Sequence, residues 1–195
     1  MQMVDVKKEK AAIDNDFLQH LLNIKKCNDV IDLIYRFFDS LQKSVVMNPF
    51  VHKHEALITQ NDKLPLLFER EIISLIPFDE IKDDEGTFSF YFTLVKQLYR
   101  DFTGSEYPCA ENEDSWLCRK SFGEVHTVAM CSMLLIPCFL SDDKKAKQLQ
   151  TLINERYLSQ IEIHNRQECC EMLKGLEAKR RKGLKGKELN WISHG

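Results

Sequence analysis

The chain has 195 residues, and its 27 lysines and arginines against 30 aspartates and glutamates give a formal net charge of −3. Its content of 44% hydrophobic and 29% charged residues excludes a disordered chain, and 7 glycines with 5 prolines exclude a collagen-like or linker-rich one. We expect a chain of this length to form one globular domain whose core needs no disulfide or metal to stabilise it.

Short apolar runs alternate with helical patterns in the first part of the chain. Residues 11–13 predict a strand that stops at the polar residues 14–16, and a helix begins at Phe17. The spacing of apolar residues over 30–41 predicts a second helix, and residues 45–47 predict a short strand. This order is typical of an α/β protein.

The next segment begins with a helix signal. Asn48 as N-cap and Pro49 in the first turn predict the start of a helix that carries Glu55. Residues 57–102 are mainly helical in pattern, and the polar, acidic residues 104–115 predict a loop.

The last part of the chain repeats the alternation of strands and helices. The predicted elements are a helix over 122–135, a strand over 137–140, a helix over 144–153, a strand over 161–163 and a helix over 167–182. Repeated strand–helix units predict an α/β fold with a central parallel sheet covered on both faces.

No segment predicts a membrane or secreted protein. The longest apolar run, residues 128–140, contains Ser132 and Pro137 and is shorter than the roughly 20 residues that span a bilayer. The charged first ten residues do not resemble a secretory signal. The 7 cysteines include no CxxC pair, which argues against a disulfide framework or a zinc ribbon. These features favour a cytoplasmic protein without membrane contact.

Six acidic residues follow predicted strands or lie near the starts of predicted helices. They are Asp14, Asp16, Glu55, Glu124, Asp142 and Asp143. Ligand sites of open α/β sheets lie beyond the carboxyl ends of the strands, so we expect these side chains to gather there. Clustered carboxylates repel one another unless a cation lies between them, and oxygen ligands suit Mg²⁺ or Mn²⁺. The pattern therefore predicts a metal site for phosphoryl chemistry.

Each of these acids also has a purely structural interpretation. Asp14, Asp16 and Asp142 are suitable N-caps, and Glu55 and Glu124 suit the first turn of a helix, where the dipole favours negative charge. The order of the whole set is what favours the metal site.

Three segments resemble the motifs of PIN-domain nucleases and occur in that family's order. Residues 12–18, Ala-Ile-Asp-Asn-Asp-Phe-Leu, are similar to its opening motif, an apolar strand that ends in Asp and leads into a helix. Residues 46–55 are similar to its second segment, a strand and a helix start followed by Glu. Residues 122–146 resemble the subgroup in which a Gly-Glu pair opens a helix and a Ser/Thr-x-Asp motif ends the next strand. The resemblance spans residues 11 to about 163.

The resemblance implies a PIN-like three-layer α/β/α fold with a central parallel sheet. It assigns catalytic roles to Asp14, Glu55, Glu124 and Asp143. It also implies that Mg²⁺ or Mn²⁺ is the cofactor.

Further positions carry over in the same way. Asp14, Glu124 and Asp143 are the implied metal ligands, and Ser141 matches the hydroxyl that orients the acidic site. Asp142 occupies the variable position between Ser141 and Asp143, and is a further candidate ligand. Another candidate, Asp16, stands where the family usually has Asn or Ser.

The resemblance divides the chain into a single PIN-like domain over 1–182 and a basic C-terminal tail over 183–195. Within the domain, residues 57–115 form a helical insertion that makes the region between Glu55 and Glu124 longer than in compact toxin-type members. The family's substrate channel and partner surface therefore do not transfer directly.

The function implied by the resemblance is a metal-dependent endonuclease, in the first place an endoribonuclease that hydrolyses RNA. It extends to a toxin of a toxin–antitoxin pair, with a small antitoxin protein covering the cleft, and to a homodimer. Two alternatives stay open: a non-catalytic PIN-like module that binds nucleic acid or protein, and a DNA- or structure-specific nuclease with the same residues.

Positive charge concentrates near the C-terminus. Residues 174–187 contain seven lysines and arginines and one glutamate, a local charge of +6. Arg180, Arg181 and Lys182 are therefore candidate phosphate contacts. The alternative is a solvated helix end, with apolar residues such as Leu189 and Ile192 holding the segment on the body of the protein.

Histidines provide weaker candidates. His52 and His54 lie two residues apart, whereas a zinc pair on one helix face needs a spacing of four, so we expect solvated histidines. His126 lies close to Glu124 in the sequence and could assist a leaving group, although a packing role is the more common one for such a residue.

Overall fold

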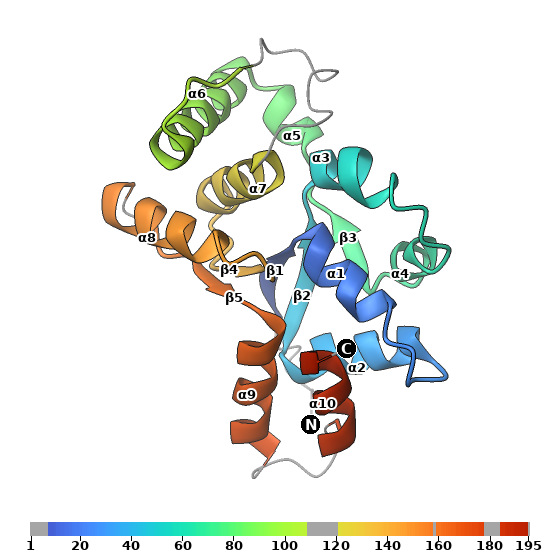
Figure 1. Cartoon of the computed structure of the whole chain (residues 1–195). Coiled ribbons are helices and arrows are strands. Elements are labelled where there is room, and N and C mark those ends of the chain that lie inside the picture. Colours follow the sequence, from blue (N-terminus) through green and yellow to red (C-terminus); the bar gives the residue numbers. More distant parts are fainter. Residues whose placement is uncertain (1–7, 109–120, 158, 178–183, 195) are drawn as a thin grey trace, which may run out of the picture.

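The computed structural model describes residues 8–108, 121–157, 159–177 and 184–194 and has a central five-stranded sheet (Figure 1). All strand pairings are parallel, and the strand order is β3-β2-β1-β4-β5. The strands are β1 (Glu9–Ile13), β2 (Lys43–Met47), β3 (Ile73–Leu75), β4 (Cys138–Leu140) and β5 (Glu162–His164). The predicted α/β class with a parallel sheet is confirmed.

The strand register brings three strand ends to one level. Ile13 is paired with both Met47 of β2 and Leu140 of β4. The backbone N–H of Asp14 then donates to the carbonyl of Leu140 at 2.9 Å. The residues that follow β1 and β4 therefore lie side by side at the carboxyl edge of the sheet.

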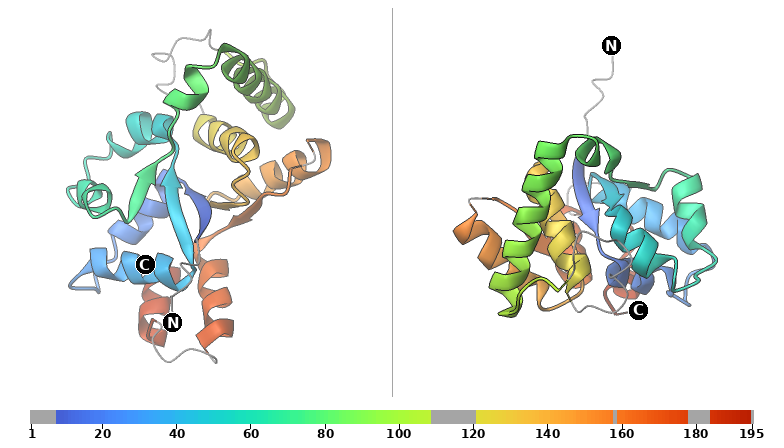
Figure 2. Two further views of the ribbon diagram at one scale, coloured as in Figure 1. Left: turned by 180° about the vertical axis from the view of Figure 1, so that it is seen from behind. Right: turned by 90° about the horizontal axis from the view of Figure 1, so that it is seen from above.

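Side chains alternate between the two faces of the sheet, and each face is covered by helices. Ala11 and Ile13 belong to one buried cluster, whereas Ala12 and Val46 belong to the other. The first cluster includes helices α1 (Asn15–Leu22), α2 (Val30–Ser40), α4 (Leu64–Glu69), α9 (Arg166–Glu177) and α10 (Gly186–His194). The second includes α5 (Asp79–Lys82), α6 (Glu85–Thr103), α7 (Phe122–Met133) and α8 (Ala146–Arg156). Figures 1 and 2 show the resulting three layers.

The segment after β2 follows the helix signal read from the sequence. The Asn48 side chain accepts a hydrogen bond from the backbone N–H of Phe50 at 2.8 Å, and Pro49 opens α3 (Pro49–Val51). The helix then widens into the π-helix η1 (His52–Ala56), where the N–H of Leu57 donates to the carbonyl of His52 at 3.0 Å. Single π turns of this kind are frequent at functional sites.

One strand and one helix start differ from the sequence prediction. Residues 57–102 contain strand β3 between helices, and this edge strand is so short that only Ile73 is buried and no alternating pattern forms. Helix α8 begins at Ala146 and not at residue 144, because the Asp143 carboxylate first accepts the backbone N–H of Lys145 in a preceding turn at 2.8 Å.

The C-terminal region forms a packed helix where the sequence predicted a basic tail over 183–195. Leu189 and Ile192 of α10 are fully buried against α2 and α9. The guanidinium of Arg36 donates to both carboxylate oxygens of Glu188, at 3.0 and 3.1 Å. A second guanidinium, that of Arg166, donates to the carbonyl of Ile192 at 3.0 Å. Arg180, Arg181 and Lys182 lie outside the described residues, as do residues 109–115 of the predicted loop.

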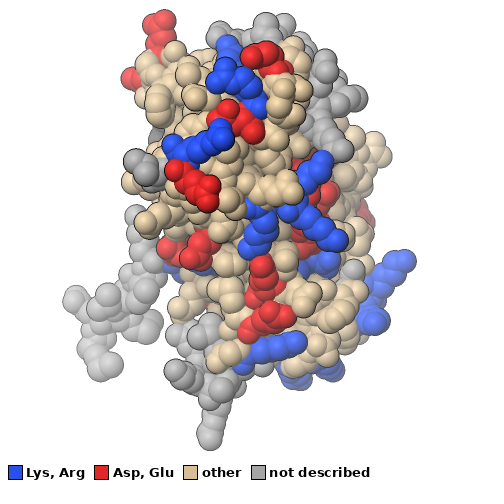
Figure 3. Space-filling model, turned by 60° about the vertical axis from the view of Figure 1, so that its left-hand side comes forward, with Lys and Arg blue, Asp and Glu red and all other residues tan. Residues whose placement is uncertain are grey.

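Charges of both signs alternate over the face formed by α6, α8 and α9 (Figure 3). Arg156 pairs with Asp101 at 3.2 Å, and Lys147 pairs with Glu168 at 3.0 Å. This face therefore carries charges of both signs and does not form a basic track for a phosphate backbone.

No described helix is long and apolar enough to cross a lipid bilayer.

Candidate acidic site

The sheet has its topological switch point between β1 and β4. From β1 the chain continues through α1 and α2 to β2 on one side, whereas β4 continues through α8 to β5 on the other. The crevice at such a point, outside the carboxyl ends of the strands, is where open α/β sheets bind ligands. Asp14 directly follows β1, and Ser141 directly follows β4.

Asp14 is held inside this crevice. Only 6% of its surface is exposed, and its Oδ2 accepts a hydrogen bond from the Ser141 hydroxyl at 2.9 Å. Burial, followed by the negative charges of Asp16 and Asp143, raises the pKa of Asp14 to about 6, although the hydrogen bond from Ser141 opposes this shift. The side chain is therefore fixed in position and costly to ionise in the absence of a cation.

Ser141 connects Asp14 to Asp143. Its hydroxyl oxygen accepts the backbone N–H of Asp143 at 3.2 Å while the hydroxyl proton is donated to Asp14. The Asp143 carboxylate is itself oriented by the backbone N–H of Lys145. The short loop after β4 thus aligns one hydroxyl and one carboxylate with the end of β1.

Glu55 approaches from η1 and contacts the first turn of α7. Gly123 makes this contact possible, because a Cβ atom at that position would lie only 2.5 Å from Oε1 of Glu55. Burial, with the charges of Asp14 and Asp16, raises the pKa of Glu55 to about 7. The glycine of the predicted Gly-Glu pair therefore provides the space that a neighbouring carboxylate occupies.

Glu124 completes the group from α7. Burial is the main reason that its pKa rises to about 8. The charge of Asp14, a hydrogen bond with Asp143 and the charge of Glu55 raise the pKa further. Glu124 therefore interacts with all three of the other predicted catalytic acids.

The structure thus brings together Asp14, Glu55, Glu124 and Asp143, with Ser141 between two of them. Their donor atoms are carboxylate and hydroxyl oxygens, which are the ligands that Mg²⁺ and Mn²⁺ prefer. In the part of the chain that is described, however, no three His, Cys, Asp or Glu side chains converge in an arrangement that could hold a metal ion. The donor chemistry fits a divalent cation, and the metal site itself stays a prediction.

Two other predicted metal ligands lie differently. Asp142 turns away from the acidic group: its carboxylate accepts the backbone N–H of Arg166 at 3.0 Å, bonds the Arg166 guanidinium and lies 2.7 Å from Nδ1 of His20. Asp16 is exposed in the first turn of α1, and its negative charge contributes to the raised pKa values of Asp14 and Glu55. The structure therefore gives Asp142 an arginine as its partner and leaves Asp16 at the rim.

The surroundings of His126 favour a packing role over the leaving-group assistance considered for it. It is buried between two tyrosines, with Nδ1 2.6 Å from the Tyr91 hydroxyl and Nε2 3.0 Å from the Tyr107 hydroxyl. Burial lowers its pKa well below the usual range, so the ring is neutral at physiological pH. This is the packing role that the sequence left open.

A polar cluster beside Asp16 was not predicted. The Gln19 amide donates to the Thr59 hydroxyl at 2.9 Å and to Oδ1 of Asn15 at 3.3 Å, and the Asn61 amide donates to Oε1 of Gln19 at 3.2 Å. Gln19 and Asn61 are 42 residues apart, so no local spacing in the sequence could have identified the cluster.

Neither a family model, nor a curated protein, nor a solved structure matches this chain.

Proposed function

We propose that the protein is a metal-dependent endonuclease that hydrolyses RNA. One observation carries the proposal: four acidic side chains from four separate segments of the chain gather at the switch point of a parallel sheet, and three of them have raised pKa values. Burying mutually repelling carboxylates destabilises a fold, so a cation that neutralises them is the simplest reason for such an arrangement.

The position of each residue suggests its role. Asp14 and Asp143 would hold the ion, with Ser141 fixing the Asp14 carboxylate by its hydrogen bond. Glu124, which interacts with both of them, would be the third ligand that the resemblance implies, and Glu55 would lie beside the ion against Gly123, where it could accept a proton. When bound, Mg²⁺ or Mn²⁺ supplies Lewis-acid chemistry to the water and to the phosphodiester.

The choice of RNA rests on the resemblance to PIN-domain nucleases, since the carboxylate geometry suits any phosphodiester. The same resemblance extends the proposal to a cytoplasmic toxin with a protein antitoxin and to a homodimer. Phosphate contacts from Arg180, Arg181 and Lys182 are part of the proposal and concern residues outside the described ranges.

A second candidate is a non-catalytic PIN-like binding module. It is favoured by the finding that no three acidic or histidine side chains of the described residues are arranged to hold a metal ion. In that case Asp143 would serve only as the cap of the turn before α8, and the raised pKa values would reflect burial alone.

Calorimetric titration with Mn²⁺, together with cleavage assays on single-stranded RNA and DNA of one sequence, tests the proposal. We expect Mn²⁺ to bind and to promote cleavage of RNA in preference to DNA. Asp143→Asn should weaken both, whereas Asp39→Asn should change neither, because Asp39 is exposed and pairs with Lys8 on the surface. Absence of both Mn²⁺ binding and cleavage in the wild type would favour the binding module.

A further inference from the structure

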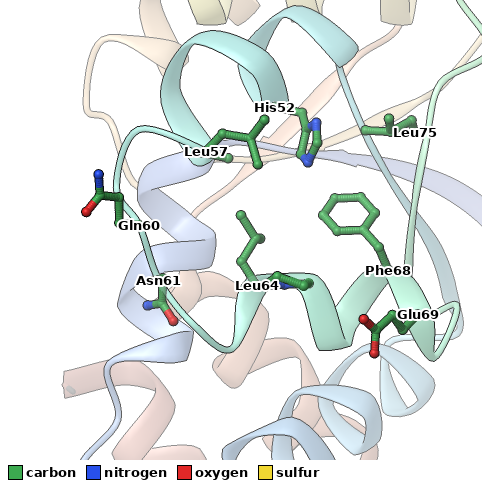
Figure 4. A pocket seen from close by; sticks show the side chains of 10 residues that line it. His52, Leu57, Gln60, Asn61, Leu64, Phe68, Glu69 and Leu75 are labelled. Atoms are coloured by element: carbon green, nitrogen blue, oxygen red, sulfur yellow. The ribbon is translucent and has the colours of Figure 1, made fainter.

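A largely apolar pocket of about 530 Å³ lies between η1, α4 and the edge strand β3 (Figure 4). Its volume is within the usual range of small-molecule sites. His52 and Leu57 face Leu64 and Phe68 across it, and Leu75 of β3 lies at one side. The His52 and Phe68 rings meet edge to face with centroids 4.8 Å apart. The pocket therefore offers ring surfaces and aliphatic walls to a flat, apolar group.

A second pocket, which is polar, adjoins the first. It measures about 560 Å³ and is lined by the Gln19 cluster, by Asp16 at the rim of the acidic group, and by Asp62 and Lys63. Gln60 and Asn61 line both pockets. A path thus runs from Asp16 at the rim of the acidic site, past the amide, hydroxyl and charged groups of the polar pocket, to the apolar pocket.

Helix η1 connects the two sites directly. Glu55 points toward Gly123 and the acidic group, whereas His52 and Ala56 of the same π turn line the apolar pocket. A group bound in the apolar pocket would therefore contact the same helical turn that carries Glu55.

This sequence of surfaces matches the parts of a single-stranded ribonucleotide. Bases of single-stranded RNA are recognised by stacking on aromatic rings and by hydrogen bonds to their edges, which amides such as those of Gln60 and Asn61 can make. Ribose hydroxyls suit the amide and hydroxyl partners of this pocket, and Lys63, whose ammonium also donates to the carbonyl of Leu22 at 3.3 Å, offers a positive charge beside Asp62 for a phosphate.

We propose that the apolar pocket binds one unstacked base of single-stranded RNA, whose ribose-phosphate lies in the polar pocket and leads to the acidic site. The proposal rests on the proposed nuclease function, for which it names a substrate subsite. It predicts that the enzyme requires a base at one fixed position relative to the cleaved bond.

Two neighbouring exposed residues provide a matched pair of variants. Leu57 is 52% exposed and lines the pocket, whereas Ile58 is 57% exposed and does not line it. Leu57→Asp places a negative charge and a polar group at the pocket, so KM for a short RNA should rise about tenfold with little change in kcat. Ile58→Asp should leave both values unchanged, because it adds the same charge to the same helix end outside the pocket.

An abasic scan of the RNA provides the second measurement. Removing the base at one position should raise KM of the wild type about tenfold and should have little further effect in Leu57→Asp. If the wild type cleaves RNA but the scan is flat, or if both Asp variants behave alike, the base pocket is wrong and the nuclease function stands.

A third measurement does not depend on cleavage. Nucleoside 5′-monophosphates are titrated into the protein while the His52 ring signals are followed by NMR. Saturable shifts that Leu57→Asp abolishes and Ile58→Asp retains would support the pocket even if no RNA is cleaved. No shift with any of the four nucleotides would overturn it, as would a dimer of the chain that Leu57→Asp dissociates, which would assign the pocket to a second copy.

Discussion

The glutamates of two regions, helix α10 and the carboxyl edge of the sheet, have pKa values shifted in opposite directions. At the C-terminal end, Glu188 of α10 accepts two hydrogen bonds from Arg36, and these bonds lower its pKa. At the carboxyl edge of the sheet, Glu55 and Glu124 have other carboxylates as neighbours, and burial raises the pKa of each. The first arrangement stabilises the fold, and the second destabilises it as long as no cation is bound. A group of acids retained at a cost in stability points to a function.

Asp14→Asn should separate activity from stability most strongly. The amide keeps an oxygen that can accept the Ser141 hydroxyl but removes the charge that holds a cation. We expect metal-dependent RNA cleavage to fall at least about a thousandfold, roughly 4 kcal/mol of transition-state stabilisation. The metal-free variant should nevertheless melt at a higher temperature than the wild type at pH 8, because position 14 then carries no buried charge. Equal cleavage by both proteins, measured on separately purified preparations, would contradict the catalytic role.

The pH dependence of stability should have opposite signs in the two regions. Asp14, Glu55 and Glu124 have folded-state pKa values of about 6, 7 and 8, above their ordinary values near 4, so the folded state binds more protons. Their contribution is fully present below about pH 4 and is lost as the pH rises through 6 to 8, by up to about 1.4 kcal/mol per pH unit for each group.

Urea unfolding of the metal-free protein between pH 5 and pH 8.5 measures this slope. Mn²⁺ should restore stability above pH 7, where the carboxylates are ionised. Glu188, whose pKa is lowered, contributes stability above its ordinary pKa and loses it on acidification. A metal-free protein whose stability increases from pH 6 to pH 8 would contradict the raised pKa values.

Glu188→Gln should produce the converse of Asp14→Asn. It removes the charge from the pair with Arg36 and weakens the cap that the carboxylate provides for the backbone N–H of Lys185 at 2.7 Å. Because the Arg36 side chain is partly exposed, we expect a loss of about 1–2 kcal/mol in the free energy of unfolding. RNA cleavage by the folded protein should be unchanged. Urea unfolding and cleavage assays on one preparation would show whether the two regions are independent.

Gly123→Ala should lower cleavage much less than Asp14→Asn does. Its Cβ would lie 2.5 Å from Oε1 of Glu55, so the Glu55 side chain must move away from Glu124. We expect about a tenfold decrease in cleavage and weaker Mn²⁺ binding. Gly175→Ala is the matched control, since nothing lies within 4 Å of its added Cβ and the change should stabilise α9 by about 0.5–1 kcal/mol. Cleavage that survives only in Gly175→Ala would place the effect at Glu55.

Local patterns predicted four of the five strands, including the edge strand β5, but not the edge strand β3. The apolar runs at 11–13, 45–47 and 137–140 correspond to β1, β2 and β4, because central parallel strands are buried on both faces. Strand β3 was not predicted, because Ile73 is its only buried residue and no alternating pattern forms. Helix α10 was predicted as a tail because the basic cluster over 174–187 precedes it, and the alternative that Leu189 and Ile192 hold the segment on the body is the one the structure shows.

The sequence predicted the parts of the acidic site that directly follow strands. Asp14 and Asp143 follow β1 and β4, and parallel strands bring such positions together. The partners of Asp142 could not be predicted, because His20 lies 122 residues away in the sequence and meets it only in the folded sheet. The same limit applies to the role of Gly123 as a space for Glu55.

The π turn of η1 fixes an angle that shorter spacing would change. A residue of an α-helix advances by 100° around the axis, and a π turn contains one residue more than an α turn for the same hydrogen-bonded closure. Deleting one residue, such as Lys53, would let the segment close as an α turn, and His52 and Glu55 would then be two positions apart on that turn and not three. His52 and Glu55 would then no longer face the apolar pocket and the acidic group at the same time. The register of this single turn therefore sets the relative orientation of the two surfaces.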